Sequence, residues 1–111
     1  MTTAKELMDF ARTRIEANRA QAGTLGAVYK FVLAGDDGGT FLINMKDNPG
    51  ITEVDGDAQC TIRMGAKDFV KMVESGTNPR QLVFFGKMKI DGDMGLAMKL
   101  SKFAEMFKNR N

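Results

Sequence analysis

Hydrophobic and polar residues alternate through the middle of the chain, and this period of two predicts β-strands. The first strand is expected over residues 27–33, followed by the hairpin turn GDDGG and a return strand. A weaker strand is expected over 51–54, and two more alternating stretches follow. The residues on the apolar faces of the stronger strands are Ala27, Tyr29, Phe31, Leu33, Phe41, Ile43, Met45, Ala58, Cys60, Ile62, Met64, Met88 and Ile90. Because the opposite faces are polar, the pattern predicts one sheet covered on one side.

Helices are expected to supply this cover, since apolar residues elsewhere recur with a period of 3.6. An amphipathic helix is expected over about residues 4–20, beginning at the capping-box sequence TAKE. A second is expected over about 66–75. Asn78-Pro79 predicts the start of a short apolar helix, because proline suits the first helical turn. A last helix is expected over about 94–108.

The last predicted helix has an apolar stripe that is broader than contact with one sheet requires. The stripe consists of Leu96, Leu100, Phe103 and Phe107, and is widened by Met94, Ala97 and Met98. This breadth indicates that the helix touches apolar material on two sides.

The chain of 111 residues, with 43% apolar and 27% charged residues, predicts one globular domain over 1–111. No apolar run is long enough to span a membrane, and the first residues, MTTAKELMDF, lack the apolar core of a signal peptide. The single cysteine, Cys60, excludes an internal disulfide and suggests a reducing compartment. A cytoplasmic protein is therefore expected.

The net charge of +2 gives no reason to expect a nucleic-acid partner. Residues 87–111 carry six basic and three acidic residues. A solvated helix face is the commoner explanation of such a bias, and transient contact with an anionic membrane surface is the alternative.

Residues that could support catalysis or hold a metal are scarce in the sequence. There is no histidine, and Cys60 lies on the apolar face of a predicted strand, where a thiol is usually inert. The segments VDGDAQ and IDGDMG lack the bidentate glutamate of a calcium loop. GTNPRQLVFFGK ends in Gly-Lys but lacks the other residues of a phosphate loop. No enzyme activity, metal or cofactor is predicted.

Methionine is unusually frequent, with nine residues in the chain. Its flexible side chain and polarizable sulfur refill irregular space. The composition alone fits an ordinary packed core best. The alternative is that Met64, Met72, Met88 and Met98, all on predicted inward faces, line a deformable apolar cavity.

From Gly26 to Leu100 the chain resembles the sterol carrier protein type 2 family. The resemblance is carried by AQCTIRM, DFVKM, NPRQLVFFGKMKI and above all GDMGLAMKL, the last two at a specific spacing. It implies an α+β fold with a mixed, mostly antiparallel five-stranded sheet, and an apolar tunnel between this sheet and helices on one face. It also implies non-enzymatic binding and transfer of fatty acids, fatty acyl-CoA, phospholipids or sterols. An alternative is a lipid-holding scaffold beside a partner enzyme, as in quinone biosynthesis.

The resemblance also implies which side chains form the tunnel wall. By position these are Phe69, Met72, Leu82, Phe85, Met88, Met94 and Met98, to which strand alternation adds Phe31, Phe41, Ile43, Ile62 and Met64. Phe85 stands where many eukaryotic members have a glutamine, so a polar anchor for a head group is not expected at this position. The final residues FKNRN are not a peroxisomal signal of the Ser-Lys-Leu type.

Overall fold

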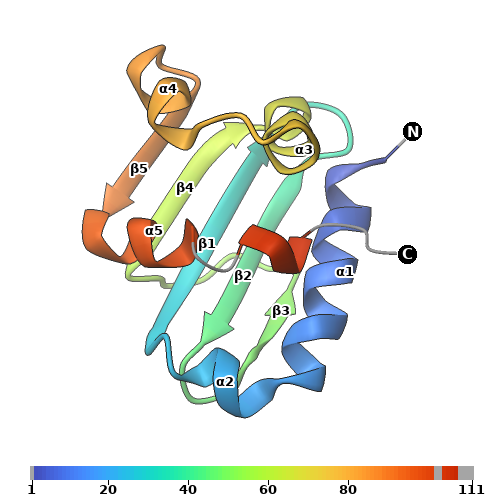
Figure 1. The fold of residues 1–111 in the computed structure, drawn as a ribbon, viewed down its shortest axis with the longest axis vertical. Helices are drawn as coiled ribbons and strands as arrows, with labels where there is room; N and C mark the ends of the chain where they lie inside the picture. The colour runs from blue at the N-terminus through green and yellow to red at the C-terminus, as the bar shows by residue number, and fades with distance from the viewer. Residues whose placement is uncertain (1, 102–103, 108–111) are drawn as a thin grey trace.

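The fold is built on one mixed five-stranded sheet, as predicted, with helices on one of its faces (Figure 1). The structure is a computed structural model that describes residues 2–101 and 104–107. The strands are β1 (Ala27–Ala34), β2 (Gly39–Met45), β3 (Gly50–Thr52), β4 (Cys60–Gly65) and β5 (Met88–Gly92). Their order across the sheet is β3-β2-β1-β4-β5, and only the β1–β4 pair is parallel.

The helices surround the inner face of the sheet. They are α1 (Ala4–Ala17), α2 (Arg19–Gly23), α3 (Ala66–Ser75), α4 (Pro79–Phe84), α5 (Met94–Ser101) and the 3-10 helix η1 (Ala104–Phe107). α1 packs beside β3, α3 packs over β1 and β4, and α4 packs against β5. α5 and η1 cross in front of the strands, with α5 over β4 and β5 and η1 between α1 and α3 (Figure 1).

Alternate residues of the central strands form the core. In β1 the burial pattern alternates strictly from Ala27 to Leu33, and Phe41, Ile43 and Met45 of β2 are almost fully buried. These side chains meet Leu7, Met8, Ala11 and Ile15 of α1 in one hydrophobic cluster. The strand periodicity therefore predicted correctly which side of the sheet is covered.

Two predicted helices have different bounds in the structure. The helix expected over 4–20 ends at Ala17, because Asn18 has non-helical backbone angles (φ −133°, ψ 47°) and its side-chain amide donates to the carbonyl oxygen of Arg14. Of the helix expected over 94–108, the structure describes the α-helix α5 and the 3-10 helix η1. Phe103 of its predicted stripe lies outside the described residues, whereas Phe107 is buried as expected.

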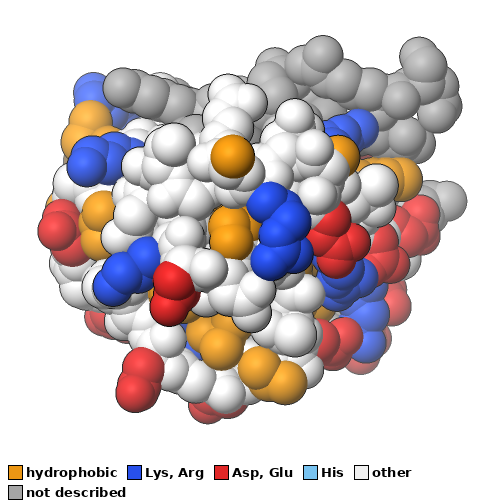
Figure 2. Space-filling view, turned by 90° about the horizontal axis from the view of Figure 1, so that it is seen from below, with side chains coloured by type: hydrophobic (Ala, Val, Ile, Leu, Met, Phe, Trp, Pro, Cys, Tyr) orange, Lys and Arg blue, Asp and Glu red, His pale blue; other side chains and the backbone are white. Residues whose placement is uncertain are grey.

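The outer face of the sheet and the ends of the molecule are polar. Arg63 of β4 and Asp91 of β5 form an ion pair at 3.1 Å, and Lys30 of β1 is 2.9 Å from Asp55 in the segment between β3 and β4. On the face at the α2 end, basic and acidic side chains are interspersed (Figure 2). The apolar side chains are thus concentrated between the sheet and the helices.

Candidate functional site

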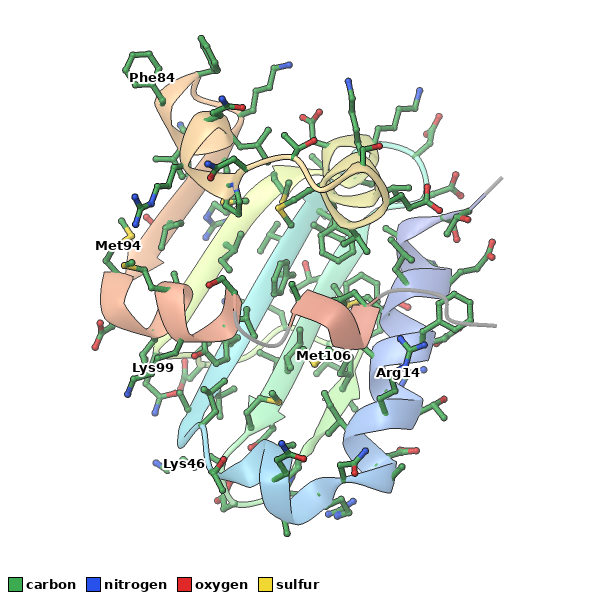
Figure 3. All side chains as sticks on the ribbon, in the orientation of Figure 1. Arg14, Lys46, Phe84, Met94, Lys99 and Met106 are labelled. Carbon is green, nitrogen blue, oxygen red and sulfur yellow. The ribbon has the colours of Figure 1, made fainter. Side chains whose placement is uncertain are left out.

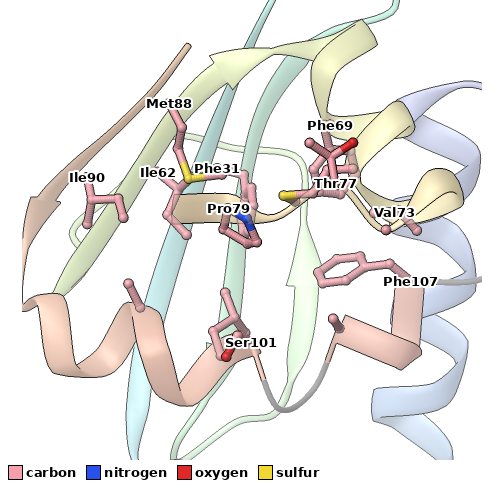
Figure 4. A pocket seen from close by; sticks show the side chains of 15 residues that line it. Phe31, Ile62, Phe69, Val73, Thr77, Pro79, Met88, Ile90, Ser101 and Phe107 are labelled. Atoms are coloured by element: carbon pink, nitrogen blue, oxygen red, sulfur yellow. The ribbon is translucent and has the colours of Figure 1, made fainter. Parts of the chain in front are cut away.

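An inner cavity of about 290 Å³ lies between the sheet and the helices on its inner face (Figure 4). Strands β1, β4 and β5 form its floor, while α3, the segment 76–79, α5 and η1 form its walls. It is lined by Phe31, Ile62, Phe69, Met72, Val73, Gly76, Thr77, Pro79, Met88, Ile90, Ala97, Leu100, Ser101, Ala104 and Phe107. With so few polar groups in this lining, the cavity suits an apolar molecule.

Three phenylalanines from distant parts of the chain form one wall of the inner cavity. Phe31 of β1, Phe69 of α3 and Phe107 of η1 pack edge to face, with ring centroids 5.4–5.9 Å apart. Edge-to-face contacts of this kind are favourable because the positive rim of one ring meets the negative face of the next. All three rings are buried, so they form a fixed apolar surface.

An outer cavity of about 420 Å³ adjoins the inner one between α4 and α5. Pro79, Ile90, Ala97 and Ser101 line both cavities, so the two cavities meet at these four residues. Only the outer cavity is lined by Asn78, Arg80, Val83, Met94 and Met98. Most of these side chains are exposed, which makes the outer cavity the mouth of the site.

The front wall of the cavity is attached to the rest of the molecule by hydrogen bonds at both ends. At one end the hydroxyl of Tyr29 donates to the carbonyl oxygen of Leu96 at 2.7 Å, and Asp93 accepts from the first amides of α5. At the other end Nη1 of Arg14 donates to the carbonyl oxygen of Met106 at 2.6 Å. These contacts hold α5 and η1 over the sheet.

Two buried titratable groups lie under α5. Burial, with smaller contributions from Cys60 and Asp93, raises the pKa of Tyr29 to about 12. Burial, with the nearby charges of Asp93 and Asp91, likewise raises the pKa of the Cys60 thiol. Both groups therefore stay neutral near pH 7, and Cys60 is the inert core thiol that the sequence predicted.

The structure brings seven of the twelve predicted site residues to the two cavities. Phe31, Ile62, Phe69, Met72 and Met88 line the inner cavity. Met94 and Met98 line the outer one. A role for these residues in ligand binding remains a prediction.

The other five predicted site residues line neither cavity. Phe41, Ile43, Met64 and Leu82 are buried in the core, and Phe85 is exposed at the surface. The resemblance to the family placed Phe85 in the tunnel wall, but in the structure Phe85 is the C-cap of α4 and its ring is exposed to solvent. Strand alternation identifies an inward face but does not show which part of that face meets a neighbouring helix.

Several lining residues were absent from the predicted set. Leu100 and Phe107 belong to the apolar stripe of the last predicted helix, and Val73 and Ile90 lie on apolar faces that the periodicity identified. The apolar periodicity of the sequence was therefore sufficient to include these four residues in the predicted site. The segment from Gly76 to Pro79 carries no periodic signal, and only the fold places it at the cavity.

The described residues offer little beyond this apolar site. Within residues 2–101 and 104–107 no cluster of three or more histidine, cysteine or acidic side chains is arranged to hold a metal. None of the helices in this part of the chain combines the length and apolar character that crossing a bilayer requires.

Comparison with known proteins gives a family match over almost the whole chain. Residues 7–105 match the model of the SCP-2 sterol transfer family. Over 87 residues the chain is 38% identical to hydroxysteroid dehydrogenase-like protein 2 of Bos taurus, an alignment that covers 76% of the chain. It spans only 21% of that relative, so the similarity concerns about a fifth of the longer protein.

Solved structures with the same fold cover nearly all of the chain. The sterol carrier protein domain 2 of Helicoverpa armigera is 27% identical, with a TM-score of 0.72 over 94% of this chain and 87% of the other. Sterol carrier protein 2 from Aedes aegypti, in complex with the C16 fatty acid palmitate, is 21% identical, with a TM-score of 0.76 over 95% and 96%. At 21% identity, the similarity to the Aedes aegypti protein supports a shared fold and nothing more.

Proposed function

The chain belongs to the SCP-2 sterol transfer family, and we propose that it is a non-enzymatic carrier that binds one fatty acyl lipid in the inner and outer cavities. The acyl chain occupies the inner cavity, against the three phenylalanines and Met88. The polar end lies in the outer cavity, near Asn78 and Arg80. The observation that carries the proposal is an apolar cavity, partly open to solvent, that is lined by the sheet, α3, α5 and η1.

The free energy of an empty cavity supports a bound molecule. At ~24 cal/mol per Å³, a closed void of 290 Å³ would destabilise a protein by about 7 kcal/mol, and this is an upper limit here because the cavity is partly open to solvent. This is comparable with the whole stability of a small domain, ~5–15 kcal/mol. Burying an acyl chain offers about 0.8 kcal/mol per methylene before the costs of association. A ligand therefore stabilises the folded chain substantially.

The lining indicates that chain length contributes more to affinity than the head group does. Thr77 and Ser101 are the polar side chains around the inner cavity, and Arg80 in the outer cavity is exposed to solvent. An exposed cation gives a carboxylate or phosphate only a modest electrostatic attraction. Fatty acids, acyl-CoA and phospholipids are thus expected to bind through the same acyl chain, and a rigid sterol is expected to fit less well.

Native mass spectrometry of the purified protein tests the proposal directly. A co-purified lipid of acyl type is expected, and the delipidated protein is expected to bind a fluorescent fatty acid at micromolar concentration or tighter. A homologous series of fatty acids should show affinity rising with chain length until the cavity is filled. A delipidated, folded protein that takes up no member of the series would contradict the proposal.

A second candidate function is a lipid-holding module that works beside a partner enzyme. The observation that favours it is the match to about a fifth of a longer dehydrogenase-like protein. In this role the cavity presents a lipid-tailed intermediate to the partner, for example in quinone biosynthesis. A stoichiometric complex recovered by affinity purification, with bound lipid that does not exchange into vesicles, would favour this module over a free carrier.

A further inference from the structure

Exposed apolar side chains are concentrated on α4 and α5, the two helices that border the outer cavity. Among the described residues six large apolar side chains are exposed, and five of them lie on α4, its C-cap or α5. We call these five the apolar rim: Val83, Phe84, Phe85, Met94 and Met98. The sixth, Val54, follows β3, which is the opposite edge strand of the sheet. A set this concentrated marks an interaction surface, whereas scattered exposed apolar residues are ordinary.

Phe84 and Phe85 are the most exposed members of the rim. Their side chains are 83% and 71% exposed, and their rings pack edge to face with centroids 5.4 Å apart. α4 occupies a corner of the molecule, and the labelled Phe84 ring points away from the body (Figure 3). Gly86, with φ +73°, turns the chain back toward β5 directly after the pair. The two rings therefore form a projecting tip.

Basic side chains flank the rim. Residues 79–101 contain Arg80, Lys87, Lys89 and Lys99 but only two acidic residues. Asp91 is paired with Arg63, and Asp93 accepts hydrogen bonds from the amides of Gly95 and Leu96. Among the described residues none of the four basic side chains forms an ion pair. The surroundings of the rim are therefore positively charged.

We propose that the apolar rim docks on an anionic lipid bilayer, with Phe84 inserted among the head groups and the outer cavity open toward the membrane. The inference rests on the proposed carrier function, because docking at the mouth would let an acyl chain pass between bilayer and cavity. Aromatic side chains flanked by lysine suit the membrane interface, where apolar rings enter and ammonium groups meet anionic phosphates.

A bilayer fits this surface better than a second copy of the chain or a protein partner does. A symmetric dimer through the rim would bring the same basic residues of both copies together, and like charges repel. A protein partner would need a pocket for two adjacent projecting rings. A bilayer accepts such a tip without a preformed pocket.

Co-sedimentation of the full chain with vesicles tests the docking. The vesicles consist of phosphatidylcholine alone or of phosphatidylcholine with about 30% phosphatidylserine, which makes their surface clearly anionic. Phe84→Ser is expected to weaken binding to the anionic vesicles by about tenfold. Lys87→Gln with Lys89→Gln is expected to weaken it by about tenfold or more, and added salt should mimic this loss. Val54→Ser and Lys46→Gln are the matched controls and should bind as the unchanged protein does.

Fatty acid uptake from aqueous solution, without vesicles, separates this inference from the proposed function. Phe84 lines neither cavity, so Phe84→Ser should take up fatty acid in solution normally, which also shows that the variant is folded. Normal uptake by the unchanged protein without binding to anionic vesicles would overturn the docking and leave the carrier function intact. The docking would also be overturned if Phe84→Ser bound anionic vesicles as well as the unchanged protein does. The same holds if the unchanged protein did not bind vesicles but formed a concentration-dependent dimer that Phe84→Ser abolished.

Discussion

The hydroxyl of Tyr29 in β1 donates a hydrogen bond of 2.7 Å to the backbone carbonyl oxygen of Leu96 in α5. The two residues are 67 positions apart in the chain. Tyr29 is fully buried, so this bond lies beneath the helix that closes the cavity. Among the described residues this is the one side-chain hydrogen bond between α5 and the sheet, and it adds to the apolar packing of Leu100 in holding the helix in place.

Replacing Tyr29 by phenylalanine tests this attachment. Tyr29→Phe keeps the ring but leaves the Leu96 carbonyl oxygen without its donor, so the free energy of unfolding should fall by about 1–2 kcal/mol. α5 should also open more often, which would speed the release of a fluorescent fatty acid. Urea unfolding and hydrogen exchange of the α5 amides measure the two effects. Unchanged exchange in α5 would show that the bond does not hold the helix.

Tyr29 also predicts how stability depends on alkaline pH. Its pKa is raised from 10.0 to about 12, so the folded state favours the protonated phenol. The stabilisation is complete below pH 10, the value for an unfolded tyrosine, and is lost as the pH rises from 10 to about 12. The free energy of unfolding should therefore fall over this range, and Tyr29→Phe should lack that part of the fall.

The titration can be observed without ambiguity, because the chain contains one tyrosine and no tryptophan. Phenolate absorbance of the folded protein should report a midpoint near pH 12. The same chain unfolded in urea should titrate near pH 10. Coincident midpoints in the two states would contradict the buried environment of Tyr29.

Arg14 provides a second test of the cavity wall. Its guanidinium donates to the Met106 carbonyl oxygen at 2.6 Å and so ties η1, which carries Phe107, to α1. Arg14→Gln should lower the free energy of unfolding by about 1.5–3 kcal/mol, the range for hydrogen bonds with a charged donor. It should also weaken fatty acid uptake, because Phe107 is no longer held against the other two rings.

A matched control for Arg14→Gln is available close by. Arg19 also donates a hydrogen bond, to Asn48, but this bond is exposed and remote from η1. Arg19→Gln should change the free energy of unfolding by less than about 0.5 kcal/mol and leave uptake unchanged. Equal effects of the two substitutions would indicate a general loss of charge and no specific role for the Arg14–Met106 bond.

The paired residues Phe31 and Phe41 show how far the sequence could predict the site. They are direct partners across β1 and β2, and alternation places both on the inward face, as the structure confirms. Phe31 lines the inner cavity, whereas Phe41 is packed in the core. Periodicity determines the face of a sheet, but the boundary between cavity and packed core depends on where α1, α5 and η1 cross the strands. That tertiary arrangement has no local signal.

Phe85 illustrates the same limit within a helix. The sequence NPRQLVFF predicted a helix correctly, and Leu82 is buried on its inward face as expected. Phe85 lies three residues further on and still donates a helical backbone hydrogen bond to Gln81, yet its ring is exposed. On a helix of six residues, helical spacing from one buried side chain does not ensure that the neighbouring side chain is also covered.

Ala97 offers a way to close the site without weakening the core. It lines both cavities and is partly exposed, so a larger side chain there can extend into open space. Ala97→Phe should fill the space where the two cavities meet and reduce fatty acid affinity by about tenfold or more, while changing the free energy of unfolding by less than about 1 kcal/mol.

The control for Ala97→Phe adds the same bulk elsewhere. Ala17→Phe, at the exposed end of α1, should leave fatty acid affinity unchanged. Isothermal titration with one fatty acid compares the two variants. Undiminished affinity of a folded Ala97→Phe variant would mean that the ligand does not pass this residue.

Met98 and Met8 separate the two explanations of the high methionine content. Met98 is 53% exposed and lines the outer cavity, whereas Met8 is fully buried on the core-facing side of α1. Met8→Ala removes a packed side chain and should lower the free energy of unfolding by about 2–5 kcal/mol. Met98→Ala should lower the free energy of unfolding by less than about 0.5 kcal/mol, because truncating a surface side chain leaves no void.

Met98→Ala should nevertheless weaken fatty acid uptake several-fold, since the bound acyl chain loses its contact with the flexible thioether. Urea unfolding and fatty acid titration of both variants give the four values needed, and a core-sized loss of stability in Met98→Ala with unchanged uptake would assign this methionine to ordinary packing.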